Sequence, residues 1–251
     1  MRLPDLPPEF LTRPLAHRAL HGGAGPENSR AAIAAAMAAG YGIEIDLQAS
    51  ADGVAMVFHD AQLNRLTRAK GAVSARRARE LTRLRLRGTS ERIPTLREVL
   101  ALIGGRVPLL IEIKDQSGAL GPVDGRLEAD TAAALQDYSG PVAVMSFNPH
   151  SMAEMARLAP DVPRGLVTCA FTPEDWPGIP GERLQELAAL DAFGPTGASF
   201  ISHDRRDLAT ASVAALKAQG APILCWTVKS AEQEVQARRI ADNITFEGYT
   251  P

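Results

Sequence analysis

The stretch Gly42-Ile43-Glu44-Ile45-Asp46-Leu47-Gln48 carries the strongest structural signal in the chain. Consecutive side chains of a β-strand point to opposite faces, so Glu44, Asp46 and Gln48 share one face and the aliphatic residues share the other. Strands of a parallel barrel are normally apolar on both faces. Two carboxylates on one buried face are costly unless they are hydrated, paired or bound to a cation. The stretch therefore predicts a buried strand that carries a polar site.

Apolar strand-like segments alternate with helix-like segments along almost the whole chain. The predicted strands are 15–19, 42–47, 54–59, 108–114, 141–147, 164–169, 198–203, 222–228 and 243–246. The clearest predicted helices are 28–39, 95–103, 125–138, 149–158, 208–219 and 231–240. Such alternation favours a parallel sheet, and about 250 residues is the usual length of a closed eight-stranded barrel. We therefore predict an α/β fold, a single (β/α)8 TIM barrel domain over residues 1–251.

The predicted strand 54–59 lies too close to its predecessor for a parallel crossover. Only Ser50-Ala51-Asp52-Gly53 separates the two, so we predict an antiparallel β-hairpin after strand 2 with a glycine-assisted turn. Folding this hairpin about Ala51–Asp52 sets position 44 roughly opposite position 59. We therefore expect His59 to lie beside Glu44.

A strongly basic segment interrupts the alternation after the hairpin. Residues 65–97 hold eleven Lys or Arg residues against two acidic residues, Glu80 and Glu91, and no clear strand. We predict a small basic insertion, about residues 61–94, that contains loops and short helices. It is expected to overhang the barrel mouth and to attract anionic molecules there, although a solvated basic face explains the same composition.

Composition excludes several classes of protein. A chain with 45% hydrophobic and 22% charged residues and a net charge of −2 is typical of a folded globular protein. No nucleic-acid partner is expected, because domains that bind nucleic acid are usually strongly basic. No stable membrane insertion is expected either, because no window approaches the roughly 18 apolar residues of a membrane span. The sequence leaves the oligomeric state undetermined.

The cysteines and the first residues favour a cytoplasmic location. Cys169 and Cys225 are too few for a disulfide framework and lie in apolar runs, so we expect two buried thiols. Prolines and an acid interrupt residues 1–8, where a signal peptide would need an apolar stretch.

A second strand repeats the unusual acidic pattern. In Leu109-Leu110-Ile111-Glu112-Ile113-Lys114-Asp115, Glu112 and Lys114 share a face. Carboxylates from two strands that converge at the C-terminal mouth of a barrel suit a hard divalent cation, Mg²⁺ or Ca²⁺. An internal ion-pair network with Lys114 and nearby arginines is the alternative interpretation.

Two histidines lie at the ends of predicted strands. His17 ends the first strand, and His59 ends the hairpin strand. Two histidines near a cation can divide general-base and general-acid work, because their pKa values lie near neutrality. The other three histidines, His21, His150 and His203, lack comparable neighbours and are interpreted as structural or surface residues.

These elements together resemble the signature of the glycerophosphodiester phosphodiesterase family. That signature begins with His-Arg-Gly and continues with Pro-Glu-Asn, Glu-x-Asp and His-Asp. The corresponding elements are His17-Arg18-Ala19, Pro26-Glu27-Asn28, Glu44-Ile45-Asp46 and His59-Asp60, followed by Glu112-Ile113-Lys114. Order and spacing match over about the first 115 residues.

The resemblance implies a barrel hydrolase that cleaves small-molecule glycerophosphodiesters to sn-glycerol 3-phosphate and an alcohol. By position, it assigns the divalent cation to Glu44, Asp46 and Glu112. It makes His17 and His59 the general acid and base. Substrate or phosphate contacts are implied for Arg18, Glu27, Lys114, Phe147 and Trp226.

Two positions depart from the family pattern. The glycine after His-Arg is Ala19, and because alanine disfavours positive φ we expect an ordinary or slightly displaced backbone there. The usual acidic ending, close to Thr-Asp-x-Pro, is replaced by residues 244–251, in which Glu247 takes the place of the aspartate.

Three other functions stay open on the sequence. The first is a related phosphodiesterase that acts on lysophospholipid or phosphoinositide head groups. The second is a metal-dependent barrel lyase that binds an enolate, which leaves the His17 and His59 pair unexplained. The third is a non-catalytic barrel that binds phosphorylated ligands, which the change at Ala19 keeps open.

Overall fold

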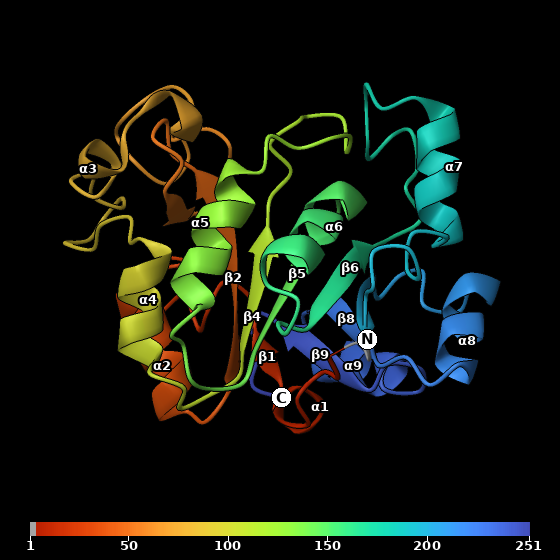
Figure 1. Cartoon of the computed structure of the whole chain (residues 1–251). Helices are drawn as coiled ribbons and strands as arrows, with labels where there is room; N and C mark the ends of the chain where they lie inside the picture. Colours follow the sequence, from red (N-terminus) through yellow and green to blue (C-terminus); the bar gives the residue numbers. More distant parts are fainter. Residues whose placement is uncertain (1–3) are drawn as a thin grey trace.

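The computed structural model describes residues 4–251, in which eight parallel strands close into a barrel and one more strand pairs on its side (Figure 1). The closure is made by β1, which pairs with β2 through Leu15 and Gly42 and with β9 through Leu15 and Thr245. The strands are β1 (Leu15–Ala16), β2 (Gly42–Ala49), β3 (Ala55–Val57), β4 (Leu109–Ile113), β5 (Val142–Ser146), β6 (Arg164–Thr168), β7 (Phe200–Asp204), β8 (Ile223–Val228) and β9 (Asn243–Phe246). The predicted TIM barrel is confirmed.

The helices surround the barrel, and all six of the clearest predicted ones are present (Figure 1). The helical elements are α1 (Glu9–Thr12), α2 (Arg30–Ala38), η1 (a 3₁₀ turn, Val73–Ala75), α3 (Ala78–Leu81), α4 (Leu96–Ile103), α5 (Arg126–Leu135), α6 (Pro149–Leu158), α7 (Gly181–Ala189), α8 (Ala211–Ala218) and α9 (Ala231–Ala237). The start of α4 illustrates how sequence fixes a boundary. Thr95 Oγ1 accepts a hydrogen bond from the Glu98 amide, and Glu98 Oε2 accepts one from the Thr95 amide.

The two faces of β2 have opposite environments, as the alternation of its sequence predicts. Ile43, Ile45 and Leu47 are fully buried in the apolar layer between barrel and helices. Glu44 and Asp46 point the other way, into the barrel. Below them the barrel is filled by an apolar cluster that includes Leu15, Leu110, Val167, Phe200 and Leu224. The polar groups therefore gather near the C-terminal ends of the strands, above an apolar floor.

The hairpin of β2 and β3 differs by one residue from the expected register. Leu47 pairs with Val57 and Ala49 with Ala55. The turn is a three-residue loop, in which Ser50 N–H donates to the Val54 carbonyl and Gly53 adopts φ +79°. A left-handed glycine at the third loop position is typical of this hairpin type, and the extra loop residue shifts the pairing. The register is therefore shifted by one residue from the one that set position 44 roughly opposite position 59.

The basic segment after the hairpin packs on an apolar cluster of its own. Met56 and Phe58 of the hairpin and Leu63 form an apolar cluster with Val73, Leu81, Leu86 and Ile93 of the segment. In Figure 1 this segment, with α3, stands at one side of the upper end of the barrel, and the excursion that carries α7 stands at the other. The two excursions thus flank the end of the barrel where the strands terminate.

The remaining sequence expectations concern cysteines and membrane spans. Cys169 and Cys225 are both buried and unpaired, as predicted. Among residues 4–251, no helix is both long and apolar enough to cross a membrane.

Candidate active site

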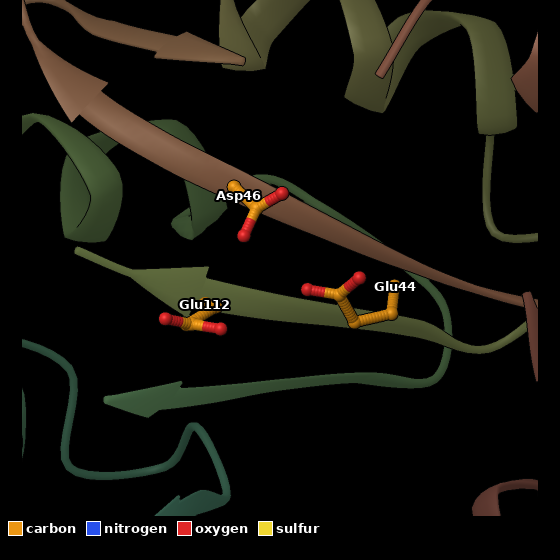
Figure 2. Close-up of side chains that lie close together, drawn as sticks. All are labelled: Glu44, Asp46 and Glu112. Carbon is orange, nitrogen blue, oxygen red and sulfur yellow. The ribbon is translucent and has the colours of Figure 1, made fainter. Parts of the chain in front are cut away.

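Three buried carboxylates converge between β2 and β4 (Figure 2). Asp46 and Glu112 are register partners on neighbouring strands, and Glu44 lies two residues before Asp46 on the same face. One oxygen from each of the three lies within 4.8 Å of the others. The side-chain alternation of two adjacent parallel strands thus builds the cluster that the sequence predicts.

A buried lysine partly neutralises this cluster. Lys114 Nζ lies 2.8 Å from Asp46 Oδ1 and 2.6 Å from Glu112 Oε1. Burial opposes the charged form of Lys114, but the two carboxylates raise its pKa above the usual value. Burial likewise acts to raise the pKa of Asp46, but Lys114 and other neighbouring positive groups hold that pKa well below its usual range. The ion-pair network considered from sequence is therefore present.

Glu44 is the carboxylate that the network leaves without a counter-ion. Its Oε2 accepts a 2.8 Å hydrogen bond from the Arg18 amide, but its Oε1 is buried without a hydrogen-bond partner among residues 4–251. Burial, followed by the charges of Asp46 and Glu112, raises the pKa of Glu44 well above its usual range. An orphaned buried oxygen beside two further carboxylates fits a hard divalent cation, whose preferred ligands are oxygens.

Asn28 fixes the orientation of Asp46, a role that the sequence reasoning missed. Its Nδ2 donates to Asp46 Oδ2 at 2.8 Å, and the Asp46 amide donates to its Oδ1 at 3.2 Å. Asn28 adopts φ 59°, a left-handed conformation that asparagine tolerates better than most residues. The sequence could have indicated a role for Asn28, because it is the last residue of the Pro26-Glu27-Asn28 element that matches the family signature.

His17 is held by a carboxylate that directly follows the last strand, β9. His17 Nδ1 lies 2.8 Å from Glu247 Oε2, and Lys229 Nζ lies 3.6 Å from the same oxygen. The hydrogen bond from His17 is the largest effect that lowers the pKa of Glu247, to about 2. An ionised carboxylate can only accept, so Nδ1 carries the proton and Nε2 is the nitrogen available for proton transfer.

His21 lies near a carboxylate that the sequence reasoning did not identify as its neighbour. Its Nε2 lies 4.0 Å from Glu247 Oε1, so it shares this carboxylate with His17. Burial lowers its pKa. The loop after β1 turns back sharply, with the His21 amide donating to the Ala19 carbonyl, and this turn is what spacing along the chain cannot show.

His59 is held by a carboxylate in a similar way. His59 Nδ1 lies 2.8 Å from Asp60 Oδ1, which again makes Nδ1 the donor and leaves Nε2 available. Burial and the charge of Lys114 lower the pKa of His59, while Asp46 opposes this effect. The strongest electrostatic neighbours of His59 are therefore Lys114 and Asp46, in place of the expected Glu44.

Arg65, from the basic segment, joins the two loops that carry these groups. Its Nε and Nη2 donate to the two oxygens of Asp60 at 2.7 and 2.8 Å. Its Nη1 and Nη2 donate to the two oxygens of Glu27 at 2.8 and 2.7 Å. Glu27 Oε1 also accepts from Arg18 Nη1 at 3.0 Å. Sequence reasoning assigned Arg65 only to the general basic character of the insertion.

The backbone after His17 is left-handed at two successive residues. Arg18 has φ 52° and Ala19 has φ 65°, so the expected ordinary backbone at Ala19 is wrong. The conformation persists because it lets the Arg18 amide reach Glu44 Oε2 and the Ala19 amide reach the Glu44 carbonyl at 2.9 Å. Alanine thus occupies a glycine-type conformation at the cost of some strain.

Phe147 and Trp226 meet in an aromatic cluster at the ends of β5 and β8. Their ring centroids are 5.6 Å apart, and Trp176 lies 5.0 Å from Phe147. Phe171 completes the cluster, 5.4 Å from Trp176. Both added residues come from the excursion before α7, for which no motif gave a signal.

The other two histidines agree with their interpretation as structural or surface residues. His203 is buried, with Nδ1 2.8 Å from Thr168 Oγ1 and Nε2 3.1 Å from the Asp207 carbonyl. His150 is exposed near the start of α6.

Comparison with known proteins decides the family. The model of the glycerophosphoryl diester phosphodiesterase family matches residues 17–244. The chain belongs to this family. The match begins at His17 and extends well beyond the first 115 residues that carry the sequence resemblance.

Two relatives in this family match a little less than two thirds of the chain. A glycerophosphodiester phosphodiesterase of Caldanaerobacter subterraneus is 33% identical over 160 residues, which are 60% of this chain and 65% of that protein. One of Bacillus altitudinis is 31% identical over 171 residues, 63% of this chain and 67% of that protein. The matched segment is thus about two thirds of each relative's length.

Solved structures of family members share the fold over nearly the whole chain. A phosphodiesterase of Oleispira antarctica, in complex with its product sn-glycerol 3-phosphate, superposes with a TM-score of 0.76 at 24% identity, covering 95% of this chain and 94% of that one. A glycerophosphodiester phosphodiesterase of Thermotoga maritima gives a TM-score of 0.70 at 21% identity, covering 92% of each chain.

Restoring the family glycine at position 19 tests the strained backbone. We expect Ala19→Gly to stabilise the protein by about 1 kcal/mol, because glycine adopts positive φ without steric cost. For a chain of this size that corresponds to a melting temperature raised by about 2–4 °C.

The matched control is Ala16→Gly, at a buried position in β1, where added backbone freedom is expected to lower the melting temperature. A melting temperature that falls equally in both variants would contradict the left-handed assignment at position 19.

Proposed function

We propose that the protein hydrolyses glycerophosphodiesters to sn-glycerol 3-phosphate and an alcohol, using a divalent cation, Mg²⁺ or Ca²⁺, and two histidines. The observation that carries the proposal is the buried carboxylate cluster, with one oxygen of Glu44 left unpartnered. His17 and His59 are each oriented through Nδ1 by a separate carboxylate. Family membership supports the substrate class.

Glu44, Asp46 and Glu112 would hold the cation. A divalent cation at this position supplies Lewis-acid stabilisation of charge on a phosphoryl oxygen. Arg18, fixed by Glu27 and close to Asp46, supplies a guanidinium suited to two parallel hydrogen bonds with phosphate. Lys114, directly after β4, adds a second positive charge beside Asp46 and Glu112.

The two histidines divide the proton transfers. One takes a proton at Nε2 from the attacking oxygen nucleophile, and the other donates a proton from Nε2 to the alkoxide as its bond to phosphorus breaks. The nucleophile is either water, which gives sn-glycerol 3-phosphate directly, or the 2-hydroxyl of the glycerol, which gives a cyclic phosphate that water then opens. Both Nδ1 atoms are held by carboxylates, which stabilise the imidazolium formed when a proton is accepted. Phe147 and Trp226, whose rings contact each other, would offer an apolar surface for the remainder of the substrate.

Activity measurements test this proposal directly. With Mg²⁺ or Ca²⁺, the purified protein is expected to release sn-glycerol 3-phosphate from glycerophosphocholine, and EDTA is expected to abolish the release. His17→Ala and His59→Ala should each lower kcat by about 10²–10⁴-fold, because general acid–base catalysis is lost.

His150→Ala, at an exposed position, is the matched control and should leave kcat unchanged. Undiminished activity in either His17→Ala or His59→Ala would refute the acid–base assignment. Binding of glycerol 3-phosphate without turnover of any diester would favour a non-catalytic barrel.

Arg65 is expected to act as a positioning residue through Asp60. Lysine cannot reproduce its fork of four hydrogen bonds, so Arg65→Lys should lower kcat about tenfold, or about 1.4 kcal/mol, with a smaller change in KM. In an Asp60→Ala background, the same substitution should lose most of its effect on kcat.

Arg79→Lys, at another exposed arginine of the basic segment, should leave both kinetic constants unchanged. An effect of Arg65→Lys on kcat that is equally large with and without Asp60 would show that Arg65 acts by another route.

A further inference from the structure

The basic segment contains arginines that its own acids do not neutralise. Glu80 Oε2 accepts a 2.9 Å hydrogen bond from the Arg77 amide. Glu91 Oε2 accepts one of 3.1 Å from the Arg30 amide, on the neighbouring helix α2. Both acidic side chains of residues 65–97 thus accept hydrogen bonds from backbone amides. Within the described chain, most of the arginine side chains of this segment have no carboxylate partner.

Four of these arginines line one cavity of about 580 Å³, which we call the arginine cavity. Its charged lining consists of Arg68, Arg83, Arg85 and Arg87. All four are exposed, and within residues 4–251 no carboxylate lies at ion-pair distance from any of them. Within residues 4–251, the one hydrogen bond made by these four side chains runs from Arg87 Nη2 to the Asn64 carbonyl, at 3.0 Å. No carboxylate of the described chain therefore competes with an external anion for these guanidinium groups.

A groove next to the arginine cavity reaches His21, near the candidate active site. It has a volume of about 470 Å³ and is lined by His21, residues 22–26, Arg87 and Thr89. Arg87 and Thr89 also line the arginine cavity, so the two hollows are adjacent. His21, which lines the groove, lies 4.0 Å from Glu247, the carboxylate that holds His17.

We propose that the arginine cavity binds a phosphate group carried by the head group of the substrate. The enzyme would then favour glycerophosphodiesters whose alcohol portion bears a further phosphate over those with a zwitterionic head group. Arginine forks bind phosphate through paired hydrogen bonds, and an anion also relieves the mutual repulsion of four guanidinium groups. The preference for such substrates rests on the proposed phosphodiesterase function, whereas anion binding in the cavity does not.

A charge reversal at the cavity tests the preference kinetically. With glycerophosphoinositol 4-phosphate as substrate, Arg83→Glu should lower kcat/KM about tenfold or more, whereas with glycerophosphocholine the change should stay within about twofold. The control is Arg79→Glu, an identical charge change at an exposed arginine of α3 that lines neither hollow. Equal losses of kcat/KM in the two variants would indicate that the overall positive charge of the segment acts at a distance, and would overturn a specific site at the cavity.

Direct binding separates the site from catalysis. Calorimetric titration with inorganic pyrophosphate in EDTA should detect binding to the wild type and to Arg79→Glu, and weaker binding to Arg83→Glu. Unchanged pyrophosphate affinity in Arg83→Glu would overturn anion binding at the cavity, whether or not the protein hydrolyses any diester. If the wild type hydrolyses neither diester but still binds pyrophosphate more tightly than Arg83→Glu does, the phosphodiesterase function and the substrate preference are refuted, while the anion site remains.

A lipid surface is the other source of clustered phosphate. Cosedimentation with phosphatidylglycerol vesicles that is lost in Arg83→Glu, together with an unchanged ratio of kcat/KM for the two diesters, would assign the cavity to lipid binding and overturn the substrate preference.

Discussion

The burial of three carboxylates inside one barrel is the constraint on which the rest of the site depends. Glu44, Asp46 and Glu112 repel one another in a region that excludes water, so each needs positive charge or a hydrogen-bond donor. Lys114 serves Asp46 and Glu112, but one oxygen of Glu44 remains without a partner. A divalent cation, which the oxygen-rich cluster fits, would complete the neutralisation.

Much of the surrounding structure positions the donors that this cluster requires. The left-handed turn at Arg18 and Ala19 brings two backbone amides to Glu44, and Asn28 holds Asp46 from the same loop. Arg65 then connects Glu27 of this loop to Asp60, beside His59. The basic segment is thus part of the active-site framework as well as an exposed surface.

The sequence predicted the parts of the site that follow from strand periodicity and failed where loops decide the geometry. Alternation along β2 and β4 was enough to place Glu44, Asp46 and Glu112 together. The register of the hairpin depended on a three-residue loop that composition alone did not distinguish from a shorter turn. Arg65 contacts Glu27, which lies 38 residues earlier in the chain. Local sequence patterns cannot predict a contact between residues so far apart.

Calorimetric titration of Mg²⁺ and Ca²⁺ into the wild type and into Glu44→Gln tests the account most directly. The account predicts that the wild type binds one of these cations and gains thermal stability, by about 2.7 kcal/mol at 100 times the dissociation constant. Glu44→Gln should fold but lose this binding. The control is Glu128→Gln on α5, where the native glutamate is buried and accepts a hydrogen bond from Ser151, and this variant should retain cation binding. Absence of binding heat and of any stability gain in the wild type would contradict the account, and equal binding by Glu44→Gln would place the cation elsewhere.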